Sequence, residues 1–217
     1  MSTRTQNYIE AVEHLPDDAV LILNGVTWEE YEHLLVDMEN WPGKRVTYYK
    51  GRLEVVSPSP KHEKIKIFID HLVAAFCDHH NIPMEDLGST TFKSKRDDQG
   101  AEPDVCFYVA GLEGIIGKDE IDPDNDPVPN IAVEIDITNS SKTKFEIYRS
   151  FGVPEIWRYD GKRMRVYQRA RDKYAEITAS AVFPDLSAAI LTKFIDLSRT
   201  QGRTRALAAF RQWLAGV

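Results

Sequence analysis

Residues 131–159 read IAVEIDITNSSKTKFEIYRSFGVPEIWRY and contain the pattern that decides the fold. The apolar run at 131–138 predicts a buried strand, residues 142–151 have helical periodicity, and residues 155–159 predict another strand. A strand, a helix and further strands in this order indicate an α/β or α+β fold, in which a mixed sheet is flanked by helices.

The segments before this unit predict a helix, a hairpin and a second, longer helix. Thr27-Trp28-Glu29-Glu30 matches a capping box that opens a helix through about Met38. Residues 45–50 and 52–56 alternate around Gly51, which is typical of a β-hairpin. Ser59 followed by Pro60 predicts the start of a helix that runs to about His80. Residues 1–24, by contrast, predict a loosely structured arm.

The rest of the chain completes the expected domain. Strands are predicted at 88–95, 104–109, 163–169 and 174–178, with a turn at 97–100, and helices at 187–197 and 200–214. A chain of 217 residues is long enough for one domain with a sizeable core. We therefore expect an N-terminal arm at 1–26, a main domain at 27–180, and a C-terminal helical extension at 181–217 packed on that domain.

Composition excludes several classes of protein. With 42% hydrophobic and 28% charged residues and only 2 Cys, the chain is neither a low-complexity protein nor a disulfide scaffold. It contains neither a membrane-length apolar run nor a signal-peptide core, so we expect a cytoplasmic protein with no membrane partner. The net charge of −7 is uneven, because residues 100–136 are strongly acidic and residues 137–173 strongly basic. An enzyme that gathers carboxylates around a metal fits this distribution, and so does a protein with two solvated faces of opposite sign.

Acidic residues stand inside strands that otherwise predict burial. Glu134 and Asp136 are two positions apart on one strand, so they project to the same face. Asp104 opens another apolar strand, and the three carboxylates converge if these strands are neighbours. Buried carboxylates need a metal ion or a basic side chain as a partner. Oxygen ligands of this kind suit Mg²⁺ or Mn²⁺.

Two further groups are candidates for the same site. Lys144 and Tyr148 are four positions apart and share one face of the predicted helix, from which the lysine can reach the carboxylates. The alternative is a buried ion pair between Glu134 and Lys144 with no chemical role. His62 and Glu63 begin the long helix, where the alternative is an exposed first turn with Glu63 favourably placed in the helix dipole.

Five segments, in this order, resemble the Uma-type family of putative restriction endonucleases in the PD-(D/E)XK nuclease superfamily. They are GRLEVVSPSPKHEKI (51–65), LGSTTFK (87–93), AEPDVCFYV (101–109), PNIAVEIDITNSS (129–141) and KFEIYRSFGVPEIWRYDGKRMRVYQ (144–168). The resemblance extends from about Trp28 to Gln168. It implies a restriction-endonuclease-like core.

The resemblance also implies roles for individual residues. Asp104 corresponds to the Asp of the PD motif and Glu134 to the acidic residue of the (D/E)XK motif. Asp136 stands where that motif has its lysine, and Lys144 on the next helix takes the place of this lysine. The implied catalytic residues are Asp104, Glu134 and Lys144, and the implied metal ligands are Asp104, Glu134 and His62. Glu63, Glu54 and Asp136 are further candidates for a ligand or for a residue that supports one.

The function implied by the resemblance is that of an endonuclease that hydrolyses DNA phosphodiester bonds with Mg²⁺ or Mn²⁺. The alternative is a non-catalytic nucleic-acid-binding or self-assembling scaffold that retains the nuclease fold. We expect DNA to be bound weakly, without a dedicated recognition motif, and the chain to form a homodimer. Basic residues after the site either contact phosphates or belong to an ordinary solvated hairpin; they are Arg149, Arg158, Lys162, Arg163, Arg165, Arg169, Arg171 and Lys173.

Overall fold

The computed structural model describes residues 3–38, 43–137 and 141–216. Its helices and strands follow one another along the chain as α1 (Thr3–Glu13), β1 (Val20–Asn24), α2 (Trp28–Met38), β2 (Arg45–Tyr49), β3 (Arg52–Val56), α3 (Pro60–His80), β4 (Glu85–Asp86), β5 (Phe92–Ser94), β6 (Gln99–Ala101), β7 (Val105–Tyr108), the 3-10 helix η1 (Leu112–Gly114), β8 (Ile131–Ile135), α4 (Lys142–Phe151), β9 (Glu155–Tyr159), β10 (Met164–Ala170), β11 (Lys173–Ile177), α5 (Ala188–Gln201) and α6 (Arg203–Leu214).

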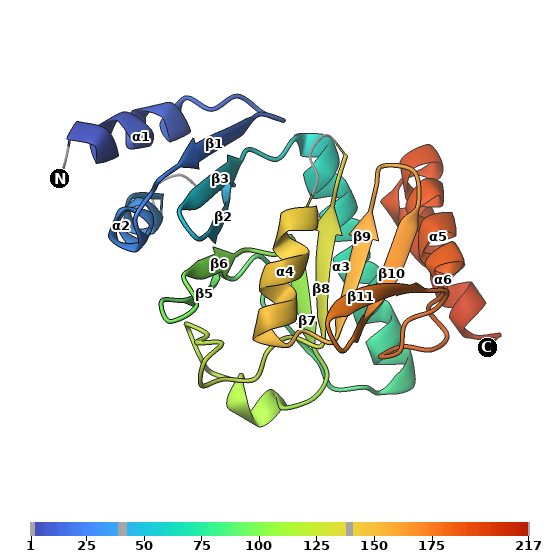
Figure 1. Ribbon diagram of the computed structural model, residues 1–217. Helices are drawn as coiled ribbons and strands as arrows, with labels where there is room; N and C mark the ends of the chain where they lie inside the picture. Colours follow the sequence, from blue (N-terminus) through green and yellow to red (C-terminus); the bar gives the residue numbers. More distant parts are fainter. Residues whose placement is uncertain (1–2, 39–42, 138–140, 217) are drawn as a thin grey trace.

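The strands form two sheets (Figure 1). The first has the order β1-β3-β2-β6-β5, and all of its neighbouring strands are antiparallel. The second has the order β11-β10-β9-β8-β7-β4 and is mixed, because β8 and β9 are parallel. The predicted class, a mixed α+β protein with sheets flanked by helices, is therefore confirmed.

Helices cover both faces of the second sheet (Figure 1). On one side α4 packs on Ala132 and Ile156, and on the other side α3, α5 and α6 pack on Val133, Ile135 and Trp157. Since successive side chains of a strand alternate between faces, Glu134 falls on the side of Ala132, which α4 covers. Every residue of β8 is buried, so the acidic residue predicted there lies inside the protein.

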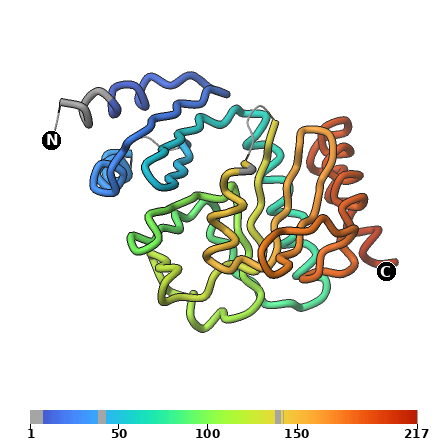
Figure 2. The backbone as a smooth tube through the Cα atoms, in the orientation of Figure 1, coloured from blue at the N-terminus to red at the C-terminus, as the bar shows by residue number. Residues whose placement is uncertain are grey.

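The helix α3 joins the two sheets. Ser59 caps its N-terminus by accepting a hydrogen bond from the backbone of His62, and Asn81 ends it in the left-handed conformation. Figure 2 shows the chain passing from the first sheet into this helix and on across the second sheet. The predicted bounds of this helix are confirmed, and so are the capping box between Thr27 and Glu30 and the hairpin around Gly51.

The expectation of a loosely structured arm is wrong. Residues 3–13 are helical, and β1 pairs with β3 over its whole length, from Val20 opposite Val56 to Asn24 opposite Arg52. Val12 is fully buried, so the first helix also contributes to the core. β1 has only 5 residues, and it belongs to the first sheet through its pairing with β3. The proposed domain boundaries remain a prediction.

Smaller differences concern strand ends. The strand predicted at 88–95 is limited to Phe92–Ser94, and Gly88, at the predicted start, has a positive φ instead of extended backbone. Gln99, predicted in a turn, begins β6 instead. Thr138, the expected last residue of the central strand, lies outside the described residues. None of the described helices is long and apolar enough to cross a membrane.

Candidate active site

A small cavity lies where the end of β8 meets the starts of α3 and α4 and the neighbouring strands β2 and β3 of the first sheet. Its volume is about 40 Å³, which is enough for a few water-sized groups. The titratable side chains that border it are Asp18, Arg45, Glu54, His62, Asp104, Glu134, Asp136 and Lys144. The structure therefore brings together all of the site residues predicted from sequence except Glu63.

Topology explains why Asp104 and Glu134 meet. Strands β7 and β8 are antiparallel neighbours, so the residue just before β7 lies beside the end of β8. The backbone N–H of Asp104 donates to the carbonyl of Val133 at 3.0 Å. Its carboxylate accepts from the backbone N–H of Ile135 at 2.7 Å. The two carboxylates thus share one end of the strand pair.

Glu134 and Lys144 form a buried ion pair. Lys144 Nζ donates to Glu134 Oε2 at 2.9 Å and to the carbonyl of Glu102 at 2.8 Å. The other carboxylate oxygen of Glu134 accepts from the hydroxyl of Tyr148. The exposed fractions of Glu134 and Lys144 are only 2% and 7%, so water contributes little to the solvation of either charge.

Burial and neighbouring charges shift the pKa values of this pair. Burial raises the pKa of Glu134 above its usual range, and the charge of Asp104 adds to the effect, although Lys144 opposes it. Burial would lower the pKa of Lys144, but the negative charges of Glu134 and Asp104 outweigh it, so the pKa is raised. The lysine therefore remains a cation inside the protein.

His62 lies against Asp104. Its Nε2 is 3.0 Å from Asp104 Oδ2, and its Nδ1 is 3.5 Å from Glu63 Oε1. Burial favours the neutral ring, but the hydrogen bonds and charges of the two carboxylates outweigh it and raise the pKa of His62 to about 9. The pKa of Asp104 is lowered, since the contacts with His62 and Lys144 outweigh the effect of its burial. At neutral pH His62 is therefore a cation that donates a hydrogen bond from Nε2 to the Asp104 carboxylate.

Asp136 holds the start of α4. Both of its carboxylate oxygens lie 3.0 Å from the backbone N–H of Ser141, and Arg158 forms an ion pair with one of them. Because α4 carries Lys144, this contact fixes where the lysine enters the cavity. Asp136 therefore positions the helix that carries Lys144.

Glu54 and Glu63 stand at the edge of the arrangement. Glu54 borders the cavity, and its Oε2 accepts from Arg52 at 2.8 Å. Glu63 does not border the cavity; its side chain is 36% exposed and lies 3.5 Å from both Arg45 and His62. The alternative of an exposed first turn is therefore wrong for His62, which is buried, and partly right for Glu63.

Sequence reasoning missed Arg45. This residue is only 9% exposed, and it borders the same cavity from the first sheet. Its guanidinium donates to the carbonyl of Lys44 at 3.0 Å, while its buried Nε has no hydrogen-bond partner in the described chain. In the sequence it is one basic residue at the start of an ordinary hairpin strand, so no signal marks it.

The carboxylates of this cavity suit a magnesium ion that keeps several waters better than a metal ion surrounded entirely by protein ligands. Within residues 3–38, 43–137 and 141–216, no three His, Cys, Asp or Glu side chains are grouped closely enough to hold a metal. Magnesium needs only one or two protein carboxylates and keeps several waters. Asp104 and Glu134 provide such a pair, since both carboxylates border the cavity.

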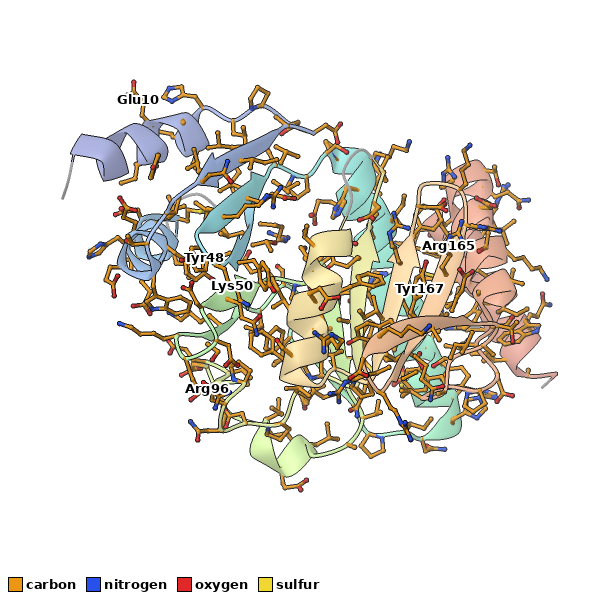
Figure 3. All side chains as sticks on the ribbon, in the orientation of Figure 1. Glu10, Tyr48, Lys50, Arg96, Arg165 and Tyr167 are labelled. Atoms are coloured by element: carbon orange, nitrogen blue, oxygen red, sulfur yellow. The ribbon has the colours of Figure 1, made fainter. Side chains whose placement is uncertain are left out.

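The basic residues that follow the site are partly neutralised. Arg149 pairs with Glu146, Arg158 with Asp136, and Arg165 with both Asp160 and Glu176. Figure 3 labels Arg165 on β10, beside Tyr167. These arginines support the sheet and its hairpin, whereas Lys162, Arg163, Arg169, Arg171 and Lys173 are exposed.

Comparison with known proteins places the chain in a family. A comparison with curated proteins finds no match. Among solved structures, the chain is similar to the crystal structure of a putative nuclease from Anabaena variabilis, with 17% identity and a TM-score of 0.48, over 69% of this chain and 90% of that chain. The profile of Uma2, described as putative restriction endonuclease, matches residues 28–200. This match over most of the chain shows that the protein belongs to the Uma2 family.

Proposed function

We propose that the protein is a metal-dependent endonuclease that hydrolyses phosphodiester bonds of DNA. The observation that carries this proposal is that Asp104, Glu134 and Lys144, from three separate elements, border one small cavity. Two carboxylates beside a buried lysine can serve phosphodiester hydrolysis, which needs a bound cation and a positive charge near the attacked phosphorus.

Asp104 and Glu134 would hold the cation, with the backbone carbonyl of Ile135 as a further oxygen donor. A bound Mg²⁺ or Mn²⁺ polarises the phosphodiester and lowers the pKa of a water molecule. A histidine binds metal only when its nitrogen is unprotonated. Since His62 donates to Asp104 and has a raised pKa, we assign it the role of orienting that carboxylate.

The protein's own residues then organise the reaction. Lys144 presents its ammonium group to the cavity, where it orients the attacking water and stabilises negative charge on the phosphate. Tyr148 fixes Glu134, and Asp136 fixes the helix that carries Lys144. Arg45 faces the cavity from the other sheet and is placed to bind a phosphate oxygen.

A second function is favoured by the same ion pair. Glu134, Lys144, Tyr148 and the carbonyl of Glu102 satisfy one another without any metal. A scaffold that binds nucleic acid or assembles with itself, and that has no hydrolytic activity, would have this closed arrangement.

Cleavage of supercoiled plasmid separates the two functions. Wild type is compared with Asp104→Asn and Lys144→Met in Mg²⁺, Mn²⁺ and EDTA, and the exposed-site variants Asp172→Asn and Lys193→Met serve as matched controls. The endonuclease nicks plasmid only with metal, and only the two cavity variants lose the activity. An intact plasmid in every condition, with protein shown to be folded, contradicts the endonuclease and favours the scaffold.

A further inference from the structure

A groove lies outside the cavity, between the first two turns of α3 and the turn that joins α5 to α6. Its volume is about 590 Å³. Four basic side chains line it, Lys61, Lys64, Arg199 and Arg203, and Ile67 and Phe68 form an apolar part of its wall. No acidic residue of the described chain lines this groove.

Most of these cations are not neutralised by the protein. Lys61, Lys64 and Arg203 are exposed, and in the described part of the chain none of them forms an ion pair. Arg199 is 3.3 Å from Asp196, and it also donates to the hydroxyl of Tyr159 at 3.0 Å. The lack of ion pairs distinguishes Lys61, Lys64 and Arg203 from the arginines that follow the site. Arg149, Arg158 and Arg165 all form ion pairs with acidic side chains.

Helix stability does not account for these positions. Lys61 and Lys64 lie in the first turns of α3, and Arg203 is the first residue of α6. The N-terminal end of a helix carries a partial positive charge, so a basic side chain there opposes the helix dipole. The protein has a net charge of −7, yet positive charge is concentrated at these two helix N-termini. This concentration of positive charge favours the binding of an anionic ligand.

The groove lies near the active-site cavity, although the two share no lining residue. Lys61 precedes His62, which borders the cavity. On the other side, Arg199 donates to the carbonyl of Gly161, and Gly161 lies against the backbone of Ile137, which also borders the cavity. Figure 1 shows the start of α3, the β9–β10 turn and the α5–α6 turn together at one end of the molecule.

We propose that this groove binds the phosphate backbone of DNA next to the bond that is cut. The inference rests on the proposed endonuclease function and adds the surface that holds the substrate. Lysine and arginine contacts to phosphates position DNA without reading its bases, and the apolar wall is suited to the sugars. Binding through this groove is therefore independent of base sequence.

The test measures binding separately from cleavage. Fluorescence anisotropy with a labelled duplex in EDTA compares wild type with the variant Lys61→Gln, Lys64→Gln and Arg203→Gln at salt concentrations from about 50 to 200 mM. The matched control is Lys50→Gln, Lys193→Gln and Arg211→Gln, three exposed basic residues that do not line the groove. We expect the salt dependence of log K to fall by about 0.9 for each lost phosphate contact, and two duplexes of unrelated sequence to be affected equally.

Three results would overturn the proposal that the groove binds DNA: no duplex binding by wild type, unchanged binding by the groove variant, or an equal loss of affinity in the control variant. The plasmid assay reports on the endonuclease independently. Wild type that binds through the groove but never nicks plasmid supports the groove and contradicts the endonuclease. If wild type nicks plasmid but the groove variant binds duplex as well as wild type does, the endonuclease is supported and the groove proposal is contradicted.

Discussion

At the scale of single residues, Lys144 can be tested for both structural and catalytic roles. Lys144→Met leaves Glu134 buried without its cation, which should lower the free energy of unfolding by roughly 3 kcal/mol. The double variant Glu134→Gln with Lys144→Met removes both charges and should recover most of this loss, yet remain inactive in cleavage. Urea unfolding at pH 7 measures the stability of each variant. A double variant as unstable as the single one would show that the two side chains do not interact as a pair.

Arg45 is the second residue whose role can be isolated. If its guanidinium binds a phosphate oxygen, Arg45→Gln should reduce kcat/KM by about 10- to 100-fold, the effect of losing one charge-assisted hydrogen bond. Arg45→Lys should retain part of the activity, because it keeps the charge but not the planar fork.

Arg96 provides the control for this prediction. It is exposed, it pairs with Asp124, and it is labelled in Figure 3 on a loop away from the cavity. Arg96→Gln should leave kcat/KM unchanged. A full-activity Arg45→Gln enzyme would exclude the phosphate contact.

At the scale of elements, α3 carries a half-buried carboxylate that should destabilise the protein at neutral pH. Burial raises the pKa of Asp70, and Asp86 raises it further, while His71 and Lys66 oppose this. The native state therefore holds the proton of Asp70 to a higher pH than the unfolded state, so stability falls as pH rises through the native pKa.

Replacing Asp70 by Asn should remove this loss. We expect Asp70→Asn to raise the free energy of unfolding by up to about 1 kcal/mol at pH 7.5, and by less at pH 4.5, where more of the carboxyl is protonated in the native state. Urea midpoints at the two pH values measure the difference, with Asp172→Asn as an exposed control. An equal gain at both pH values would contradict the assigned cause.

The elements also show what sequence can predict here. Alternation within β8 and the four-residue spacing of Lys144 and Tyr148 predicted which side chains meet, because both are local periodicities. β1 pairs with β3, and α2 and β2 lie between these two strands in the sequence. The sequence near the N-terminus therefore contains no local pattern that predicts the pairing. Arg45 and the basic groove depend on how the first sheet, α3 and the last helices pack, and no spacing within one element reveals that packing.

At the scale of the whole molecule, the proposed metal site predicts that a divalent cation stabilises the fold, since Asp104 and Glu134 come together only in the folded chain. Magnesium at 100 times its Kd adds about 2.7 kcal/mol, which raises the Tm of a chain of this size by roughly 5 to 10 °C. Thermal unfolding with and without EDTA measures the shift, and Asp104→Asn should abolish it. A shift of equal size in that variant would place the bound ion elsewhere.

The cavity draws its residues from both sheets and from two helices, and this governs when activity first arises. Arg45, Asp104 and Lys144 lie far apart in the sequence, so the cavity is complete only when both sheets and α4 have assembled. If the proposed function is correct, a growing or partly unfolded chain would lack the complete site and would not cut DNA. On refolding from urea, plasmid cleavage should therefore return in the same kinetic phase as the global fluorescence signal, because long-range pairing limits both.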